Sequence, residues 1–219
     1  MYLRRLPDEA VRWPLTTLWG ELAAMKEDCT TLMYRSLGAN DRFRYMVQML
    51  KELQKVWTFQ TVLEVGCAEG KMTRELADIF PYVYAIDFCW EFIHRCPELD
   101  GVEYAVRDIE GWTPKAKYDV IVMSEVLEHL HKPGDAFERM ACHADWLLIS
   151  CPVTEPLNPA GAFDASLFGR EHSVGDASGH IWSFDAEGMT KLLDTPRAKV
   201  HRSERVGHSQ VSLYETCDG

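Results

Sequence analysis

Short apolar runs that alternate with helical segments place the strongest constraint on how this chain folds. Five runs of β-favouring residues occur between residues 61 and 150, and they are Val62–Val65, Val83–Ile86, Val102–Val106, Val120–Met123 and Trp146–Ser150. Helical patterns fall between several of them, at Lys71–Ile79, Trp90–Cys96 and Asp135–Cys142. Strands that are apolar along their whole length are typical of parallel sheets covered by helices on both faces. The sequence therefore predicts an α/β fold with a doubly wound sheet.

The two ends of the chain depart from this alternation. A helix near Ala186–Leu193 is followed by the alternating strands Val200–Arg205 and Gln210–Tyr214, which Gly207 joins as a hairpin. This pattern predicts that the sheet ends with an added antiparallel strand. Before residue 59 the sequence predicts a helical extension, residues 1–58. It contains a helix at Leu15–Tyr34 and a second helix that Asp41 caps, with its apolar face formed by Phe43, Met46, Val47 and Leu50.

Composition narrows the cellular setting and the class of partner. The chain has 219 residues, enough for one domain with a full core, and its formal net charge of -11 disfavours nucleic acid as a partner. Neither a secretory signal nor an apolar run of membrane-spanning length occurs, so no membrane association is expected. Its seven cysteines are scattered and form no C-x-x-C pair, which is typical of reduced thiols in a cytoplasmic protein.

A glycine loop follows the first predicted strand and precedes a helix. The segment Glu64–Gly70 reads Glu-Val-Gly-Cys-Ala-Glu-Gly, and glycines there allow a tight turn and a close approach to a ligand. Asp87 ends the second strand, where a carboxylate binds both hydroxyls of a ribose, and Asp108 and Ile109 follow the third. A purely structural turn and a nicotinamide dehydrogenase are the alternatives. The dehydrogenase does not explain Glu64, which suits a ligand carrying an ammonium group.

These segments, together with Tyr118–Glu125, resemble the successive motifs of class I S-adenosylmethionine-dependent methyltransferases over residues 60–130. The resemblance implies a Rossmann-like methyltransferase domain at residues 59–219 that binds S-adenosylmethionine. The cofactor-binding residues it implies are Glu64, Gly66, Cys67, Ala68, Glu69, Gly70, Asp87, Phe88, Asp108, Ile109, Ser124 and Glu125. Within this set, Asp87 would hold the ribose, while Phe88, Asp108 and Ile109 would bind the adenine. Ala68 departs from the family's usual central glycine, as in rhizobial N-methyltransferases with a Gly-Cys-Ala-Glu-Gly loop.

The segment Ser124–Leu130 follows the fourth strand, at the edge of the sheet where ligands bind in open α/β folds. If it forms a helical turn, Glu125, Glu128 and His129 share one face. One interpretation is that these residues close the floor of the cofactor pocket. The other is a Mg²⁺ or Mn²⁺ site formed by Glu125, Glu128, His129 and His180, as in the similar ubiquinone-pathway O-methyltransferases.

The segment 151–184 is expected to bind the acceptor, because long connections in compact domains often form lids or binding loops. It is rich in proline and glycine and carries His180, Trp182 and Phe184, an aromatic composition that suits a sugar ring. We expect His180, His129 and Glu128 to be the catalytic groups, as general base or metal ligands. The extension 1–58 would cover the pocket as a lid or pair two subunits in a homodimer, and the sequence leaves both open.

The predicted function is O-methylation of a small hydroxylated metabolite, with a sugar or glycoside favoured. An alcohol is a poor nucleophile at neutral pH, so it needs a base or a metal, whereas a neutral amine attacks unaided. N-methylation of an amino sugar or other small amine is therefore the alternative enzyme. A third reading, from another class, is a non-catalytic cofactor-binding partner subunit, since fold alone does not determine function.

Overall fold

Residues 37–153 and 195–217, with the single positions 182, 184, 188, 189 and 193, are the part of the chain that the computed structural model describes. The predicted helix Leu15–Tyr34, residues 154–180 of the expected acceptor segment and most of the helix near Ala186–Leu193 lie outside it. The described residues thus contain the whole sheet and the motifs between residues 60 and 130.

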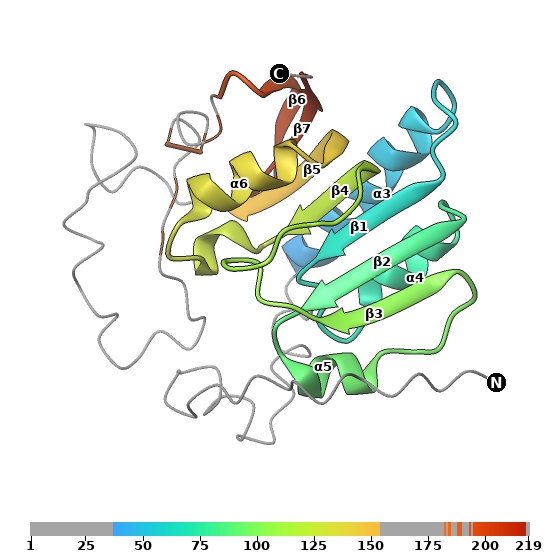
Figure 1. Ribbon diagram of the computed structural model, residues 1–219. Coiled ribbons are helices and arrows are strands. Elements are labelled where there is room, and N and C mark those ends of the chain that lie inside the picture. The colour runs from blue at the N-terminus through green and yellow to red at the C-terminus, as the bar shows by residue number, and fades with distance from the viewer. Residues whose placement is uncertain are drawn as a thin grey trace.

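Seven strands form a single mixed sheet with the order β3-β2-β1-β4-β5-β7-β6 (Figure 1). Their bounds are β1 Thr61–Val65, β2 Tyr82–Asp87, β3 Val102–Val106, β4 Tyr118–Ser124, β5 Ala144–Pro152, β6 Ala198–Val206 and β7 Ser209–Thr216. Strands β1 to β5 are parallel, and β7 inserts antiparallel between β5 and β6. The predicted doubly wound sheet with an antiparallel ending is confirmed. Gly207, at a φ of 62°, lies in the tight turn of the closing hairpin, as expected.

Helices cover both faces of this sheet (Figure 1). Their bounds are α3 Leu37–Leu53, α4 Lys71–Ala77, α5 Trp90–Arg95, the 3₁₀ helix η1 Leu127–His129 and α6 Pro133–Ala141. Alternation along the strands divides the core into two layers. On one face, Leu63 and Ile121 pack with Phe137 of α6. On the other, Val62 and Val120 pack with α3 and α4 through Met46 and Leu76.

The helix that precedes β1 begins earlier than the sequence predicts. We expected Asp41 to cap it, but α3 starts at Leu37, so Asp41 lies inside the helix and the capping prediction is wrong. A glycine in a helix costs only about 1 kcal/mol, so Gly38 does not prevent helix formation. Burial of Met46 and Leu50 against the sheet favours the longer helix. Within the described residues, no helix is long and apolar enough to cross a membrane.

Candidate functional site

The glycine loop connects β1 to α4 and adopts left-handed backbone at three positions. Gly66, Ala68 and Gly70 have φ angles of 75°, 46° and 77°. A Cβ atom added at Gly66 would lie 2.6 Å from Cγ2 of Val126, so the loop needs glycine there for space as well as for backbone angle. Ala68 adopts its φ without being glycine, at an expected cost of about 1–3 kcal/mol. Strain of this size persists where surrounding contacts hold the backbone.

Asp87 supplies the contacts that hold the loop. It ends β2, and its two carboxylate oxygens accept hydrogen bonds from the backbone N–H groups of Ala68, at 3.0 Å, and Cys89, at 2.9 Å. Burial raises the pKa of Asp87 to about 6, although these N–H groups favour the charged form. Each oxygen retains a second lone pair. The side chain is thus placed where the sequence predicts a ribose-binding carboxylate, at the carboxyl end of β2 beside the loop.

Glu64 lies beneath the loop, with 3% of its surface exposed. The hydroxyl of Thr73, on α4, donates to one of its carboxylate oxygens at 2.6 Å. Burial, with a smaller contribution from the negative charge of Asp87, raises the pKa of Glu64 to about 8, and the hydrogen bond from Thr73 opposes this shift. Thr73 is a partner that the sequence analysis did not identify, because a threonine in the first turn of a helix has no distinguishing pattern.

We expect Glu64→Gln to flatten the pH dependence of stability. The folded-state pKa of Glu64 is raised from 4.5 to about 8, so its contribution is fully present below pH 4.5 and is lost as the pH rises to about 8. Between pH 5 and pH 8, the free energy of unfolding of the native chain should therefore fall by about 3 kcal/mol more than that of the variant. Urea unfolding of both proteins at pH 5 and pH 8 measures it. Equal pH dependence in the two proteins would contradict the assignment.

A buried ion pair joins α3 to the end of β4. Nη1 of Arg42 lies 3.2 Å from Oε2 of Glu125, with the side chains 10% and 13% exposed. Ser150 donates a hydrogen bond to the other carboxylate oxygen of Glu125 at 3.0 Å, and its hydroxyl lies 3.1 Å from that of Ser124. Arg42 also donates to the hydroxyl of Ser209, at 3.4 Å. Burial raises the pKa of Glu125, and the charge of Arg42 opposes that shift.

Arg42 is the residue of this cluster that sequence reasoning missed. A signal was present: Arg42 falls four residues before Met46 and eight before Leu50, on the face of α3 that is buried. A charged residue in line with a buried face indicates a buried partner. Glu125 itself has a φ of 56°, so the chain leaves β4 in a left-handed conformation.

Glu128 and His129 lie in η1, which begins at Leu127, so Glu125 precedes the helical turn instead of sharing a face with them. Glu128 is fully buried, and neither of its carboxyl oxygens has a well-formed hydrogen bond to the described residues. The Cys151 thiol lies beside it, and burial raises the pKa of both groups well above their usual values. Nε2 of His129 lies 3.8 Å from Oε1 of Glu128, with 13% of the His129 side chain exposed.

The predicted metal ligands are only partly brought together. Among the described residues, no three or more His, Cys, Asp or Glu side chains are arranged to hold a metal ion. Burial also raises the pKa of the Glu128 carboxyl well above its usual value, and a protonated carboxyl is a poor ligand for Mg²⁺. The fourth predicted ligand, His180, lies outside the described residues. Glu128 instead uses its main-chain carbonyl, which accepts the backbone N–H of Trp182 at 3.0 Å.

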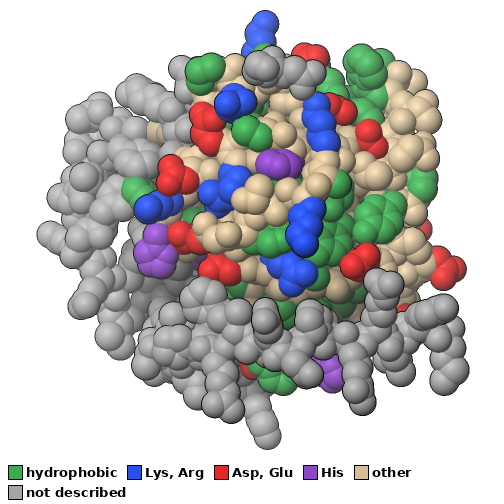
Figure 2. Space-filling model, in the orientation of Figure 1, with side chains coloured by type: hydrophobic (Ala, Val, Ile, Leu, Met, Phe, Trp, Pro, Cys, Tyr) green, Lys and Arg blue, Asp and Glu red, His purple; other side chains and the backbone are tan. Residues whose placement is uncertain are grey.

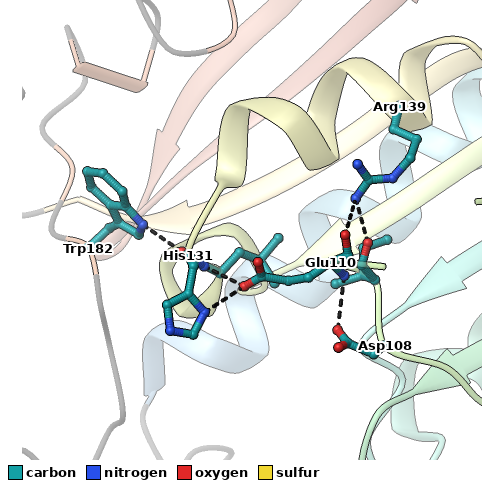
Figure 3. A network of polar contacts seen from close by, with 7 residues as sticks. Asp108, Glu110, His131, Arg139 and Trp182 are labelled. Atoms are coloured by element: carbon teal, nitrogen blue, oxygen red, sulfur yellow. Dashed lines mark hydrogen bonds and ion pairs between the residues drawn. The ribbon is translucent and has the colours of Figure 1, made fainter. Parts of the chain in front are cut away.

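The turn after β3, which the sequence predicts to bind an adenine, is anchored to α6 (Figure 3). Asp108 accepts the backbone N–H of Glu110 at 3.0 Å, and Arg139 donates to the carbonyl oxygens of Ile109, at 2.6 Å, and Glu110, at 3.2 Å. The Glu110 carboxylate in turn contacts the backbone and ring of His131. Sequence reasoning found Asp108 and Ile109 but missed Arg139, whose role depends on packing between distant segments.

The remaining predicted cofactor residues surround the same edge of the sheet. Phe88, directly after Asp87, is 49% exposed, whereas Ile109 is buried. Glu69 forms an ion pair with Arg95 of α5, at 2.9 Å. Cys67 is buried within the loop. The loop, Asp87, Phe88 and the Asp108–Ile109 turn thus lie at the carboxyl ends of three adjacent strands, where ligands bind in open α/β sheets.

Comparison with known proteins agrees with this geometry. The model of the methyltransferase domain family matches residues 39–195, so the match begins within α3. Nodulation protein S of Sinorhizobium fredii is 30% identical over 112 residues, 45% of this chain and 52% of that protein. Protein-L-isoaspartate O-methyltransferase of Vibrio atlanticus is 27% identical over 93 residues, 39% of this chain and 45% of that protein. The chain thus spans about half the length of the curated relatives it matches.

The fold is also shared with a solved structure. The N-methyltransferase NodS of Bradyrhizobium japonicum WM9, in complex with S-adenosylhomocysteine, superposes with a TM-score of 0.63 at 18% identity, covering 84% of this chain and 90% of that one. At this identity the superposition establishes the fold, and the family match over more than half of the sequence establishes the relationship. The chain belongs to the class I S-adenosylmethionine-dependent methyltransferases.

Proposed function

We propose that this chain transfers the methyl group of S-adenosylmethionine to a small hydroxylated acceptor, with a sugar or glycoside as the favoured substrate. The observation that carries the proposal is the glycine loop held by Asp87, with the Asp108–Ile109 turn on the next strand. A carboxylate for the ribose and a turn for the adenine at adjacent strand ends fit a nucleoside ligand. Residues 59–219 would form the domain, with 151–184 as the acceptor-binding segment.

Methyl transfer requires the protein to align the acceptor with the methyl donor and to remove one proton. The sulfonium of the cofactor already activates the methyl group, so the protein has to place the acceptor oxygen in line with the methyl carbon and the sulfur. His129 and His180 are the groups we propose to take the proton, directly or as metal ligands, since an alcohol does not attack unaided. Glu128 would act through the position of η1, because its own carboxyl is fully buried and burial raises its pKa well above the usual value.

The acceptor is expected to be a small molecule and not a nucleic acid. The chain carries a formal net charge of -11, which repels a phosphate backbone. On the face seen in Figure 2, lysine and arginine side chains are interspersed with aspartate and glutamate. Trp182 is the aromatic residue that we propose to contact a sugar: it is partly buried, stacks on the fully buried Phe184 at 6.3 Å, and its Nε1 donates to the carbonyl of Leu130 at 2.6 Å.

A second candidate is N-methylation of an amino sugar or other small amine. The observation that favours it is the match to nodulation protein S and to the N-methyltransferase NodS. The two candidates differ in how the acceptor loses its proton. A hydroxyl acceptor needs a base or a metal in the transition state, whereas a neutral amine loses its proton after the transfer.

The test uses S-adenosylmethionine with a tritiated methyl group and two matched acceptor sets, glycosides and the corresponding amino sugars. We expect labelled glycoside product. The rate of labelling should fall at least tenfold in His129→Gln if this histidine takes the proton directly, or on addition of a chelator if a metal assists. Label in the amino sugars alone, insensitive to both changes, would contradict O-methylation and support the amine. Binding of S-adenosylhomocysteine without turnover of any acceptor would instead support a cofactor-binding partner subunit.

A further inference from the structure

Two cysteine thiols converge on a single backbone oxygen of the cofactor loop. Sγ of Cys67, within the loop, lies 3.7 Å from the carbonyl oxygen of Ala68, and Sγ of Cys96 lies 3.2 Å from the same atom. Cys96 directly follows α5, as its C-cap residue. The Cys67 thiol also forms a side-chain hydrogen bond with Cys96, so the two sulfur atoms are neighbours although they are 29 positions apart in the sequence.

The two thiols also influence each other. Cys67 is buried, and Cys96 is half-buried. Contact with the Cys96 sulfur raises the pKa of the Cys67 thiol above its usual value, and burial raises it further. A thiol with a raised pKa is a poor leaving group in exchange, so a reductant displaces the Cys67 sulfur slowly once the disulfide has formed.

The other described cysteines have different surroundings. The Cys89 thiol donates to the Glu91 carboxylate at 3.2 Å, and Cys151 is buried beside Glu128. Cys142 and Cys217 are exposed. Among the described cysteines, Cys67 and Cys96 are therefore the two whose thiols meet at a common acceptor.

We propose that Cys67 and Cys96 are a modification site, at which a low-molecular-weight disulfide converts the two thiols to an intramolecular disulfide that impairs cofactor binding. The binding part of this inference rests on the proposed function of the loop. The overall exchange consumes one small disulfide and two protein thiols, and it gives one protein disulfide and two small thiols. Protein sulfur is oxidised and the small disulfide is reduced by the same two electrons.

Accessibility sets the order of the two steps. Cys96 is the more exposed thiol, so its thiolate attacks the small disulfide, forms a mixed disulfide and expels one small thiol. Cys67 then loses its proton, attacks the Cys96 sulfur and expels the second small thiol. Because the Cys67 pKa is raised, this second step is expected to be the slow one and to accelerate with pH.

A disulfide at this position would disturb the loop where it meets the cofactor. The sulfur atoms would move to about 2.05 Å apart, and the Ala68 carbonyl would lose both thiol donors. Ala68 already occupies left-handed backbone, and its N–H is the group that Asp87 accepts. A shift at Ala68 is thus transmitted directly to the carboxylate that we propose to bind the ribose.

The experiment treats the purified chain with oxidised glutathione, blocks free thiols and digests it with trypsin. Cys67, Cys89 and Cys96 fall in separate tryptic peptides, residues 56–71, 75–95 and 96–107, so mass spectrometry identifies the bridge directly. We expect a 56–71/96–107 cross-linked species that disappears with dithiothreitol. Calorimetric titration with S-adenosylhomocysteine should give a Kd at least tenfold higher for the oxidised chain than for the reduced chain.

Cys96→Ser is the test variant and Cys142→Ser the matched control. Cys96→Ser should bind S-adenosylhomocysteine like the reduced native chain and lose its sensitivity to glutathione disulfide, whereas Cys142→Ser should keep it. Failure of the 56–71/96–107 bridge to form, or an unchanged Kd when it has formed, would overturn the inference. Failure of the reduced chain to bind would instead contradict the proposed function, and the bridge is detected independently of binding.

Discussion

Asp87→Ala is expected to weaken the binding of S-adenosylhomocysteine at least 100-fold. The variant removes the carboxylate that accepts the N–H groups of Ala68 and Cys89, and each hydrogen bond to a charged acceptor contributes about 1.5–3 kcal/mol. It also removes the group proposed to bind the ribose hydroxyls. A 100-fold change in Kd corresponds to about 2.7 kcal/mol of binding free energy, which the loss of these contacts can account for. Calorimetric titration of the native chain and the variant measures it.

Asp119→Ala is the matched control for this prediction. The Asp119 carboxylate also accepts two backbone N–H groups, those of Gln60 and Thr61, each at 2.7 Å. These groups lie at the amino end of β1, at the opposite edge of the sheet from the glycine loop. Both variants should lose unfolding free energy, about 2 kcal/mol each, and only Asp87→Ala should lose the ligand. Equal losses of affinity would show that Asp87 acts through general stability.

Arg42→Met is expected to lower the free energy of unfolding by about 3–5 kcal/mol, the usual cost of removing one partner of a buried ion pair. The variant leaves the Glu125 carboxylate buried, at a position of left-handed backbone, with the hydroxyls of Ser150 and Ser209 as hydrogen-bonding partners among the described residues. Adding Glu125→Gln should recover part of the loss, because an amide is less costly to bury than an unpaired charge. Chemical denaturation of the native chain, both single variants and the double variant measures the coupling.

Arg202→Met is the control for the arginine itself. Arg202 contacts Glu204 at 2.8 Å and Glu52 at 3.4 Å, but its side chain is 42% exposed. Exposed ion pairs contribute about 0–1 kcal/mol, so this variant should remain close to the native stability. If Arg42→Met were equally mild, the pair between α3 and β4 would not be a stabilising contact.

Local patterns were sufficient to predict the order of the strands along the chain and the cofactor loop. The apolar runs from Val62 to Ser150 indicate buried parallel strands because side chains on both faces of such a strand avoid water. Asp87 and Asp108 could be predicted as ligand-binding residues because Asp87 ends β2 and Asp108 lies two residues after β3, and parallel strands bring their carboxyl ends to one edge. The antiparallel ending followed from alternation on either side of Gly207.

The start of α3 could not be predicted in the same way. Gly38 and Asn40 are ordinary signals for a break, yet the helix continues through them from Leu37. The cost of placing glycine in a helix, about 1 kcal/mol, is smaller than the free energy gained when Met46 and Leu50 are buried against the sheet. The sequence shows the apolar face of the helix, and only the packed structure shows where α3 begins.

The sequence by itself determined the sheet, the glycine loop and the carboxylates at the strand ends, because each depends on residues close together in the chain. Tertiary structure alone decided which distant side chains meet: Arg42 with Ser209, 167 positions apart, and Cys67 with Cys96 at the Ala68 carbonyl. It also decided that Glu128 is fully buried, which raises the pKa of its carboxyl well above the usual value, although it belongs to an acidic motif. Burial and pairing depend on three-dimensional proximity, which no local spacing in the sequence records.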